Sequence, residues 1–159
     1  MFSVLLAFGS NLGDRYQTLT DAWCVLGQTE KINTVRISPF YETEPVGGVP
    51  GQPKYINAAG IIQTVLQPAE LLQALQRIEE NFGRIRIQRW EARTLDIDIL
   101  LYGEQIVELP TLTIPHTEML HRQFVLAPAH DIAADWIHPL TKKTLREHWQ
   151  NISKKEGAT

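Results

Sequence analysis

Short apolar runs and apolar positions at helical spacing alternate along the first two thirds of the chain. The runs predict buried strands, whereas spacings of three and four residues predict amphipathic helices. Asp14 is a candidate N-cap and Gly27 a candidate stop for the first helix, while Pro68 opens the second helix and Gly83 ends it. The predicted order is a strand over 4–8, a helix between 14 and 27, strands over 35–41 and 55–65, a helix over 68–82 and a strand over 95–101.

This βαββαβ order predicts an α+β fold with a ferredoxin-like core, in which an antiparallel-rich sheet carries two helices on one face. Prolines divide the last third into short pieces, with short helices expected near 118–121 and 142–151. That third is expected to cover the other face, so that the sheet lies between helical layers. A length of 159 residues without repeats or linkers predicts a single domain over 1–159.

Two segments lack a regular pattern. Residues 42–54 contain three prolines and three glycines, which excludes regular structure and predicts a long loop. Residues 84–93 hold four of the nine arginines and also predict a loop. Long loops within compact domains are frequently functional.

The composition of the chain limits the kinds of binding partner that it can have. A net charge of −3 argues against bulk attraction to nucleic acid or to an anionic membrane. No apolar stretch reaches the roughly 18–20 residues of a membrane span, and no secretory leader is visible. Cys24, the single cysteine, cannot form an internal disulfide. We therefore expect a cytoplasmic protein whose clustered arginines bind a small polyanion.

The sharpest chemical feature is an Asp-x-Asp pair in the last predicted strand. Side chains alternate along a strand, so Asp96 and Asp98 share one face, with their Cα atoms about 7 Å apart. Mg²⁺ prefers carboxylates completed by phosphate oxygens and water. For an isolated pair, a solvated strand face is the alternative, but the preceding arginines favour a metal-bound polyphosphate. The opposite, apolar face is expected to hold Leu95, Ile97, Ile99 and Leu101.

Other positions leave two interpretations open. Gln76 and Glu79 lie beside the apolar stripe of the second helix, where a solvated flank is the alternative to a binding function. Tyr55 and Asn57 share a strand face and suit a flat heterocycle, although cross-strand packing also explains the tyrosine. Phe124 is most simply a core residue. The glycine turn over 9–13 lacks both the Walker and the dinucleotide pattern.

Seven short motifs, spread over nearly the whole chain, resemble those of a known family. The motifs occupy residues 9–13, 38–47, 55–59, 76–79, 89–100, 114–116 and 122–126. In order and spacing they resemble the 6-hydroxymethyl-7,8-dihydropterin pyrophosphokinase family of folate biosynthesis. The resemblance implies an enzyme that moves diphosphate from ATP to the pterin hydroxymethyl oxygen and releases AMP.

The same resemblance implies site residues. Asp96 and Asp98 match the ligands of two Mg²⁺ ions, and with Arg84 and Arg93 they form the catalytic set. Matched ATP-site positions are Gln76, Glu79, Arg84, Arg93, Ile99, His116 and Arg122. Matched pterin-site positions are Thr43, Val46, Tyr55, Asn57, Asp96 and Phe124, and Trp90 matches an aromatic residue of a lid.

Two other classes of protein serve as alternatives. A non-catalytic ferredoxin-like module would bind nucleotide or pterin without depending on Mg²⁺. An RNA-binding module of similar topology is disfavoured, because the chain is acidic and lacks the aromatic RNP stretch. A monomer is expected, since all the ligand-binding parts come from one chain.

Overall fold

The computed structural model describes residues 1–11, 14–43, 54–83 and 95–157. Its elements in chain order are β1 (Phe2–Ser10), α1 (Arg15–Gln28), β2 (Ile32–Ile37), β3 (Tyr41–Thr43), β4 (Tyr55–Thr64), α2 (Pro68–Phe82), β5 (Asp96–Tyr102), β6 (Val107–Leu109), β7 (Leu112–Ile114), α3 (Gln123–Ala133) and α4 (Leu145–Gly157). The predicted βαββαβ order corresponds to β1, α1, β2, β4, α2 and β5.

The main sheet has the strand order β2-β4-β1-β5, and β3 pairs with β4 beyond the end of β2. All of these pairings are antiparallel. Each helix of the βαββαβ order therefore connects two strands that have one strand between them, which is the ferredoxin-like arrangement. The predicted fold class, α+β with a ferredoxin-like core, is confirmed.

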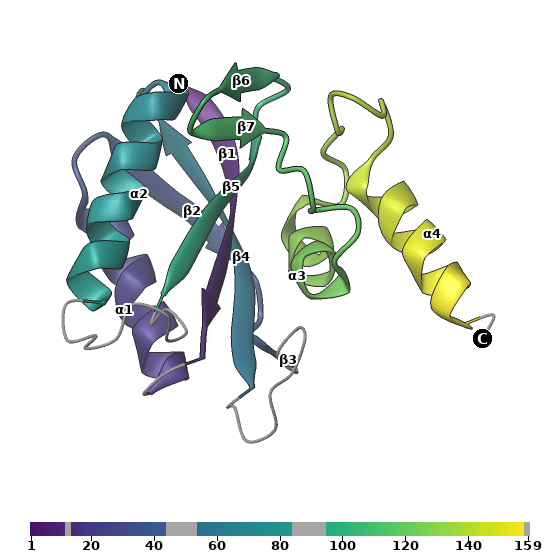
Figure 1. Cartoon of the computed structure of the whole chain (residues 1–159), viewed down its shortest axis with the longest axis horizontal. Coiled ribbons are helices and arrows are strands. Elements are labelled where there is room, and N and C mark those ends of the chain that lie inside the picture. Colours follow the sequence, from purple (N-terminus) through teal and green to yellow (C-terminus); the bar gives the residue numbers. More distant parts are fainter. Residues whose placement is uncertain (12–13, 44–53, 84–94, 158–159) are drawn as a thin grey trace.

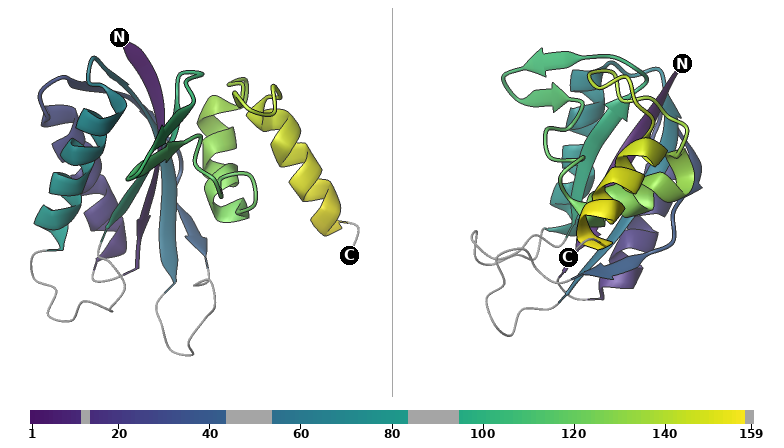
Figure 2. Two further views of the ribbon diagram at one scale, coloured as in Figure 1. Left: turned by 45° about the horizontal axis from the view of Figure 1, so that its top comes forward. Right: turned by 90° about the vertical axis from the view of Figure 1, so that its right-hand side faces the viewer.

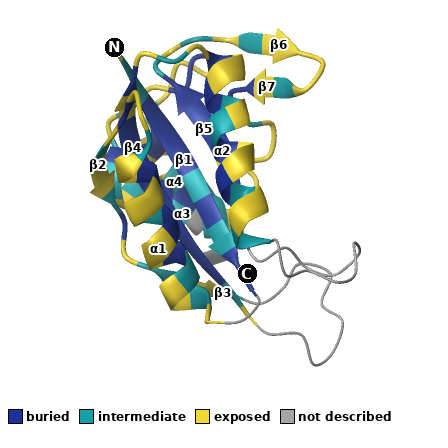
Figure 3. Cartoon of the chain, turned by 90° about the vertical axis from the view of Figure 1, so that its left-hand side faces the viewer, coloured by how far each residue is buried: buried dark blue, intermediate teal, exposed yellow. Residues whose placement is uncertain are grey.

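Helices cover both faces of the sheet (Figures 1 and 2). α1 and α2 lie on one face, α3 lies on the other, and α4 packs outside α3. β1, β4 and β5 are largely buried between these layers, whereas the outer helix surfaces are exposed (Figure 3). Alternate residues of β1 supply two cores: Leu6 and Phe8 pack with α1 and α2, whereas Leu5 packs with Leu126 and Ala129 of α3.

A bulge changes one predicted side-chain direction. In the β1–β5 register Leu5 faces Leu101 and Leu6 faces Ile99, so Leu100 is an extra residue in β5. Leu101 was expected on the face of Ile99, but it packs in the core beside α3. A residue inserted into one strand shifts the alternation of the residues that follow it. The prediction was therefore wrong at Leu101.

The strand predicted over 35–41 is divided into two strands. β2 ends at Ile37 and β3 begins at Tyr41, and Pro39 lies in the break between them. Proline cannot donate a ladder hydrogen bond, which accounts for the break. Ser38 still bridges to β4, because its N–H donates to the Ala59 carbonyl at 2.8 Å. The predicted loop over 42–54 is wrong at Glu42 and Thr43, which belong to β3.

The last third differs most from the prediction. Residues 118–121, where a short helix was expected, form turns. The helix in this region is α3, which begins at Gln123 and continues through Pro128. A proline inside a helix removes one hydrogen bond, and burial of Leu126, Ala129 and Ala133 offsets this loss.

Two further elements differ from the prediction. The β6–β7 hairpin was not predicted, and α1 extends through Gly27 to Gln28. Among the described helices, none is long and apolar enough to cross a bilayer.

We expect two histidines to make stability depend on pH. Burial lowers the pKa of His138 and of His148, and the neighbouring charge of His148 lowers that of His138 further. The unfolded chain, with ordinary pKa values near 6.5, therefore binds more protons than the folded chain as the solution is acidified. The two neutral histidines therefore contribute to the free energy of unfolding in full above pH 6.5. This contribution is lost as the pH falls toward the lowered pKa values of the folded chain.

Thermal melts between pH 7.5 and 5 would measure this dependence. His148→Gln is expected to flatten the loss of stability on acidification, whereas His121→Gln, which removes an exposed imidazole, should keep the wild-type slope. If stability fell equally steeply with pH in His148→Gln and in the wild type, the dependence could not come from His148.

Candidate active site

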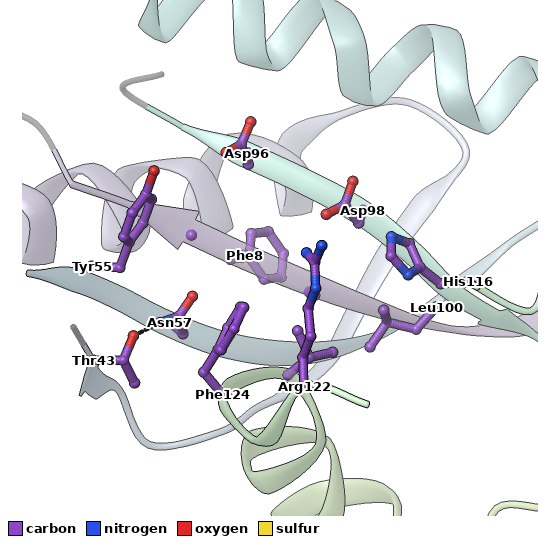
Figure 4. Close-up of a pocket in the computed structure, with 13 residues that line it drawn as sticks. Phe8, Thr43, Tyr55, Asn57, Asp96, Asp98, Leu100, His116, Arg122 and Phe124 are labelled. Atoms are coloured by element: carbon purple, nitrogen blue, oxygen red, sulfur yellow. Dashed lines mark hydrogen bonds between the residues drawn. The ribbon is translucent and has the colours of Figure 1, made fainter. Parts of the chain in front are cut away.

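A pocket opens on the α3 side of the sheet, at the ends of β1, β4 and β5 (Figure 4). The main chain of the sheet forms its floor, and the first turn of α3 forms one wall. Its lining residues are Ala7, Phe8, Gly9, Thr43, Tyr55, Asn57, Asp96, Asp98, Leu100, His116, Arg122, Phe124 and Val125.

Gly9 forms the centre of the floor. In the strand registers Gly9 faces Asn57 of β4 on one side and Asp96 of β5 on the other. A Cβ atom at Gly9 would lie 3.3 Å from Asn57 Oδ1, closer than ordinary van der Waals contact. The absence of a side chain therefore keeps the space between the amide and the carboxylate open. The sequence pattern missed this function, because it depends on the register of three strands.

We expect Gly9→Val to weaken binding of a flat ligand between Asn57 and Asp96. The valine methyl groups would occupy the floor of the pocket, and the expected loss of affinity is about tenfold, equivalent to about 1.4 kcal/mol. Val4→Ala is a suitable control, since it changes a buried β1 side chain on the opposite face of the sheet. Ligand calorimetry on both variants is the measurement, and unchanged affinity in Gly9→Val would contradict this description of the floor.

The acid pair faces the pocket from β5. Asp96 is half-buried and Asp98 is exposed, whereas Ile97 between them is buried in the core beside α2. β1 pairs with one edge of this segment, and on the other edge Glu79 of α2 accepts the Ile97 N–H at 2.8 Å. The backbone that carries both carboxylates is thus fixed on both sides.

The negative charge of Asp96 also acts on Tyr55. Burial raises the pKa of the Tyr55 hydroxyl, and the nearby Asp96 carboxylate raises it further. The residues present fit a magnesium ion, because two carboxylates on one strand face leave positions for phosphate oxygens and water. In the described part of the chain, no group of three or more His, Cys, Asp or Glu side chains could enclose a metal.

Two nitrogen donors lie near Asp98 (Figure 4). His116 Nδ1 accepts the Glu118 N–H at 3.1 Å, which leaves the proton of a neutral imidazole on Nε2. Arg122 precedes α3, and its guanidinium carbon is 5.8 Å from the centre of the Phe124 ring. Donors beside an acid pair suit the oxygens of a polyphosphate bound through a metal.

The other end of the pocket is aromatic and amide-bearing (Figure 4). Tyr55 and Phe124 contribute half-buried rings, and Asn57 lies between them and the floor. Asn57 Nδ2 donates to Thr43 Oγ1 at 2.6 Å, which orients the amide. Rings beside an oriented amide suit a flat, hydrogen-bonding heterocycle.

The structure brings most of the sequence-predicted residues together. Those that line the pocket are Thr43, Tyr55, Asn57, Asp96, Asp98, His116, Arg122 and Phe124. Phe124, which residue type alone placed in the core, is half-buried at the pocket wall. Gln76, Glu79 and Ile99 do not line the pocket: Gln76 is exposed on α2, and the Ile99 side chain is buried in the core. Val46, Arg84, Trp90 and Arg93 lie outside the described residues.

Sequence comparisons match the whole region that builds this site. The family model described as 7,8-dihydro-6-hydroxymethylpterin-pyrophosphokinase (HPPK) matches residues 5–134. A Haemophilus influenzae relative, named 2-amino-4-hydroxy-6-hydroxymethyldihydropteridine pyrophosphokinase, is 44% identical over 87% of this chain and 86% of its own length. A Pseudomonas aeruginosa relative of the same name is 42% identical over 83% of this chain and 81% of its own.

Solved structures show a similar fold. A Plasmodium falciparum HPPK-DHPS structure with pterin and p-hydroxybenzoate has a TM-score of 0.77 at 15% identity, covering 99% of this chain and 44% of that one. An HPPK-DHPS structure in complex with substrates has a TM-score of 0.76 at 14% identity, with the same coverage. The fold, the extent of the family match and the identity to these relatives lead to one conclusion: the chain belongs to the 7,8-dihydro-6-hydroxymethylpterin-pyrophosphokinase family.

Proposed function

We propose that this chain transfers the β,γ-diphosphate of ATP to the hydroxymethyl oxygen of 6-hydroxymethyl-7,8-dihydropterin and releases AMP, in folate biosynthesis. The observation that carries the proposal is a pocket that joins a heterocycle-binding end to an acid pair, in a member of this family. The names of the relatives are those of enzymes, so a non-catalytic binding module is not favoured.

In the proposed step the hydroxymethyl oxygen bonds to the β-phosphorus, and the bond from that phosphorus to the α,β-bridging oxygen breaks. The electron pair of the broken bond leaves with AMP. The hydroxyl proton passes to water or to a carboxylate of the pocket, Asp96 or Asp98. Such displacements need little covalent help from the protein, so positioning and charge neutralisation supply most of the acceleration.

Asp96 and Asp98 would hold Mg²⁺, proposed as two ions. Bound Mg²⁺ neutralises negative charge on the triphosphate and polarises its oxygens. The hydrogen bond from Ile97 to Glu79 supports this function, since it fixes the backbone between the two carboxylates. Arg84 and Arg93, outside the described residues, are proposed to contact the phosphates.

The remaining ATP contacts are proposed around β5 and α3. His116 Nε2 and the Arg122 guanidinium donate to ATP from the pocket wall. The Ile99 side chain is buried, so its proposed contribution comes from its backbone N–H, which lies on the same strand edge as that of Ile97. Glu79 on α2 contacts that edge, Gln76 precedes it by three residues on the same helix, and both are proposed to bind the nucleotide there.

The pterin is proposed to bind at the aromatic end. Asn57 would hydrogen-bond the edge of the ring system, and Tyr55 and Phe124 would cover its faces. Thr43 orients the Asn57 amide, which supports this assignment. Val46 is proposed to meet the ring, and Trp90 to close over it.

We further propose a cytoplasmic monomer with a single domain over 1–159. A monomer would suffice for this function, because one chain supplies both the acid pair and the aromatic end of the pocket. Nucleic acid and membranes are not proposed as partners, in keeping with the net charge of −3.

Consumption of ATP in the presence and absence of the pterin tests this function. We expect consumption only when MgATP and 6-hydroxymethyl-7,8-dihydropterin are both present. Calorimetry with ATP, with and without Mg²⁺, separates the non-catalytic alternative, because that module would bind ATP equally well in both conditions. Well-folded protein that consumes no ATP with both substrates present would contradict the proposal.

A further inference from the structure

A side-chain hydrogen bond joins the edge of the sheet to the helix that covers it. The Tyr41 hydroxyl of β3 donates to Asp131 Oδ2 of α3. This hydrogen bond, with smaller contributions from burial and from the Asp131 charge, raises the pKa of Tyr41 to about 12. The hydroxyl therefore keeps its proton, and remains a donor, throughout the neutral range.

Both partners belong to elements that carry pocket residues. Tyr41 and Thr43 share one face of β3, because they are two residues apart on a strand. α3 carries Phe124 and Val125 in its first turn, at the pocket wall. The Tyr41–Asp131 hydrogen bond therefore connects the strand on one side of the aromatic end to the helix on the other.

Tyr41 is also a direct neighbour of the pterin-site amide. In the register of β3 and β4, Tyr41 faces Asn57 and Thr43 faces Tyr55. One row across the sheet thus runs Tyr41, Asn57, Gly9 and Asp96. Asn57 is held from two positions on β3, by its strand pairing with Tyr41 and by its hydrogen bond to Thr43 Oγ1.

β3 needs such a restraint, because it is a strand of three residues that pairs only with β4 among the described strands. A short edge strand has few ladder hydrogen bonds and is easily displaced from its sheet. A shift of β3 would move Thr43 Oγ1 away from Asn57 and break the hydrogen bond that orients the Asn57 amide.

We propose that Tyr41 and Asp131 are positioning residues for the pterin subsite. Their hydrogen bond holds β3 against α3, and so fixes Thr43, the Asn57 amide and Phe124 relative to one another. The proposal rests on the proposed function and adds two residues that do not line the pocket. The acid pair lies on β5, on the far side of β1, and of the nucleotide contacts proposed above only Arg122 adjoins α3. Nucleotide binding should therefore depend on this hydrogen bond much less than pterin binding does.

The test measures two affinities of the folded protein separately. The first is the Kd for 6-hydroxymethyl-7,8-dihydropterin in the presence of Mg²⁺ and a non-hydrolysable ATP analogue, and the second is the Kd for that analogue with Mg²⁺. Tyr41→Phe is expected to weaken pterin binding about fivefold, since it removes only the donating hydroxyl. Nucleotide binding should stay within about twofold of wild type.

Further variants keep the test decisive. Asp131→Ala should match Tyr41→Phe, Asp131→Asn should lose less because an acceptor oxygen remains, and the double variant should lose no more than either single change. Tyr102→Phe is the matched control: it removes a tyrosine hydroxyl that donates to the Leu66 carbonyl in the other core, and it should leave pterin affinity unchanged.

Three results would overturn the proposal: wild-type pterin affinity in Tyr41→Phe, equal losses for pterin and nucleotide, or additive losses in the double variant. Failure of the proposed function would look different, since the wild-type protein itself would then bind no pterin.

Discussion

Asp98→Ala is expected to reduce turnover by about 1,000-fold while the chain keeps its fold. Asp98 is exposed on β5 and contributes no buried contact to either core, so its removal should cost little stability. Turnover should fall because the pocket loses one of the two carboxylates proposed to hold Mg²⁺ beside the phosphates. Steady-state kinetics with varied Mg²⁺ would measure the effect, and circular dichroism would check the fold.

The matched control for Asp98→Ala is Asp21→Ala. It removes an exposed carboxylate on α1 that accepts a hydrogen bond from Gln17 and does not line the pocket, since α1 covers the other face of the sheet (Figure 2). This variant should turn over at the wild-type rate. Near-normal turnover by Asp98→Ala would show instead that Asp96 and Asp98 are only the solvated face of an amphipathic strand.

Gly60→Ala is expected to destabilise the fold by about 2–3 kcal/mol. A Cβ atom at Gly60 of β4 would lie 2.5 Å from Trp23 Cζ3 and 3.0 Å from Phe8 Cε2. The two rings pack edge to face, with centroids 5.9 Å apart, in the core between the sheet and α1. A close-packed core cannot admit the extra methyl group without moving a ring. Urea denaturation would give the free energy of unfolding.

A second substitution tests the cause of this loss. Trp23→Phe shortens the ring that the new methyl group would meet, so Gly60→Ala should cost less in that background than in the wild type. The same cost in both backgrounds, or wild-type stability of Gly60→Ala itself, would contradict the proposed clash.

Local patterns in the sequence predicted the βαββαβ core, because its strands and helices carry clear apolar periodicity and turn residues. The errors arose where tertiary contacts override a local signal. Pro128 marks a break by residue type, yet burial of the surrounding α3 side chains holds the helix through it. Leu101 changed faces because the bulge at Leu100 is a property of the pairing between β1 and β5.

The candidate site was predictable in part. Alternation along one strand placed Asp96 and Asp98 on one face, and residue chemistry indicated a metal-bound phosphate. The family resemblance, not periodicity, indicated His116, Arg122 and Phe124, because they come from segments without a regular pattern. Gly9 and Tyr41 were missed, since their positions beside Asn57 follow from strand register, which no local pattern specifies.

Identification of both products of one reaction tests the proposed diphosphate transfer most directly. The protein would be incubated with Mg²⁺, ATP and 6-hydroxymethyl-7,8-dihydropterin, and the nucleotide and pterin products would be identified by mass spectrometry. Attack at the β-phosphorus predicts equal amounts of AMP and the pterin diphosphate. ADP with a pterin monophosphate, or cleavage of ATP without any phosphorylated pterin, would exclude diphosphate transfer by this chain.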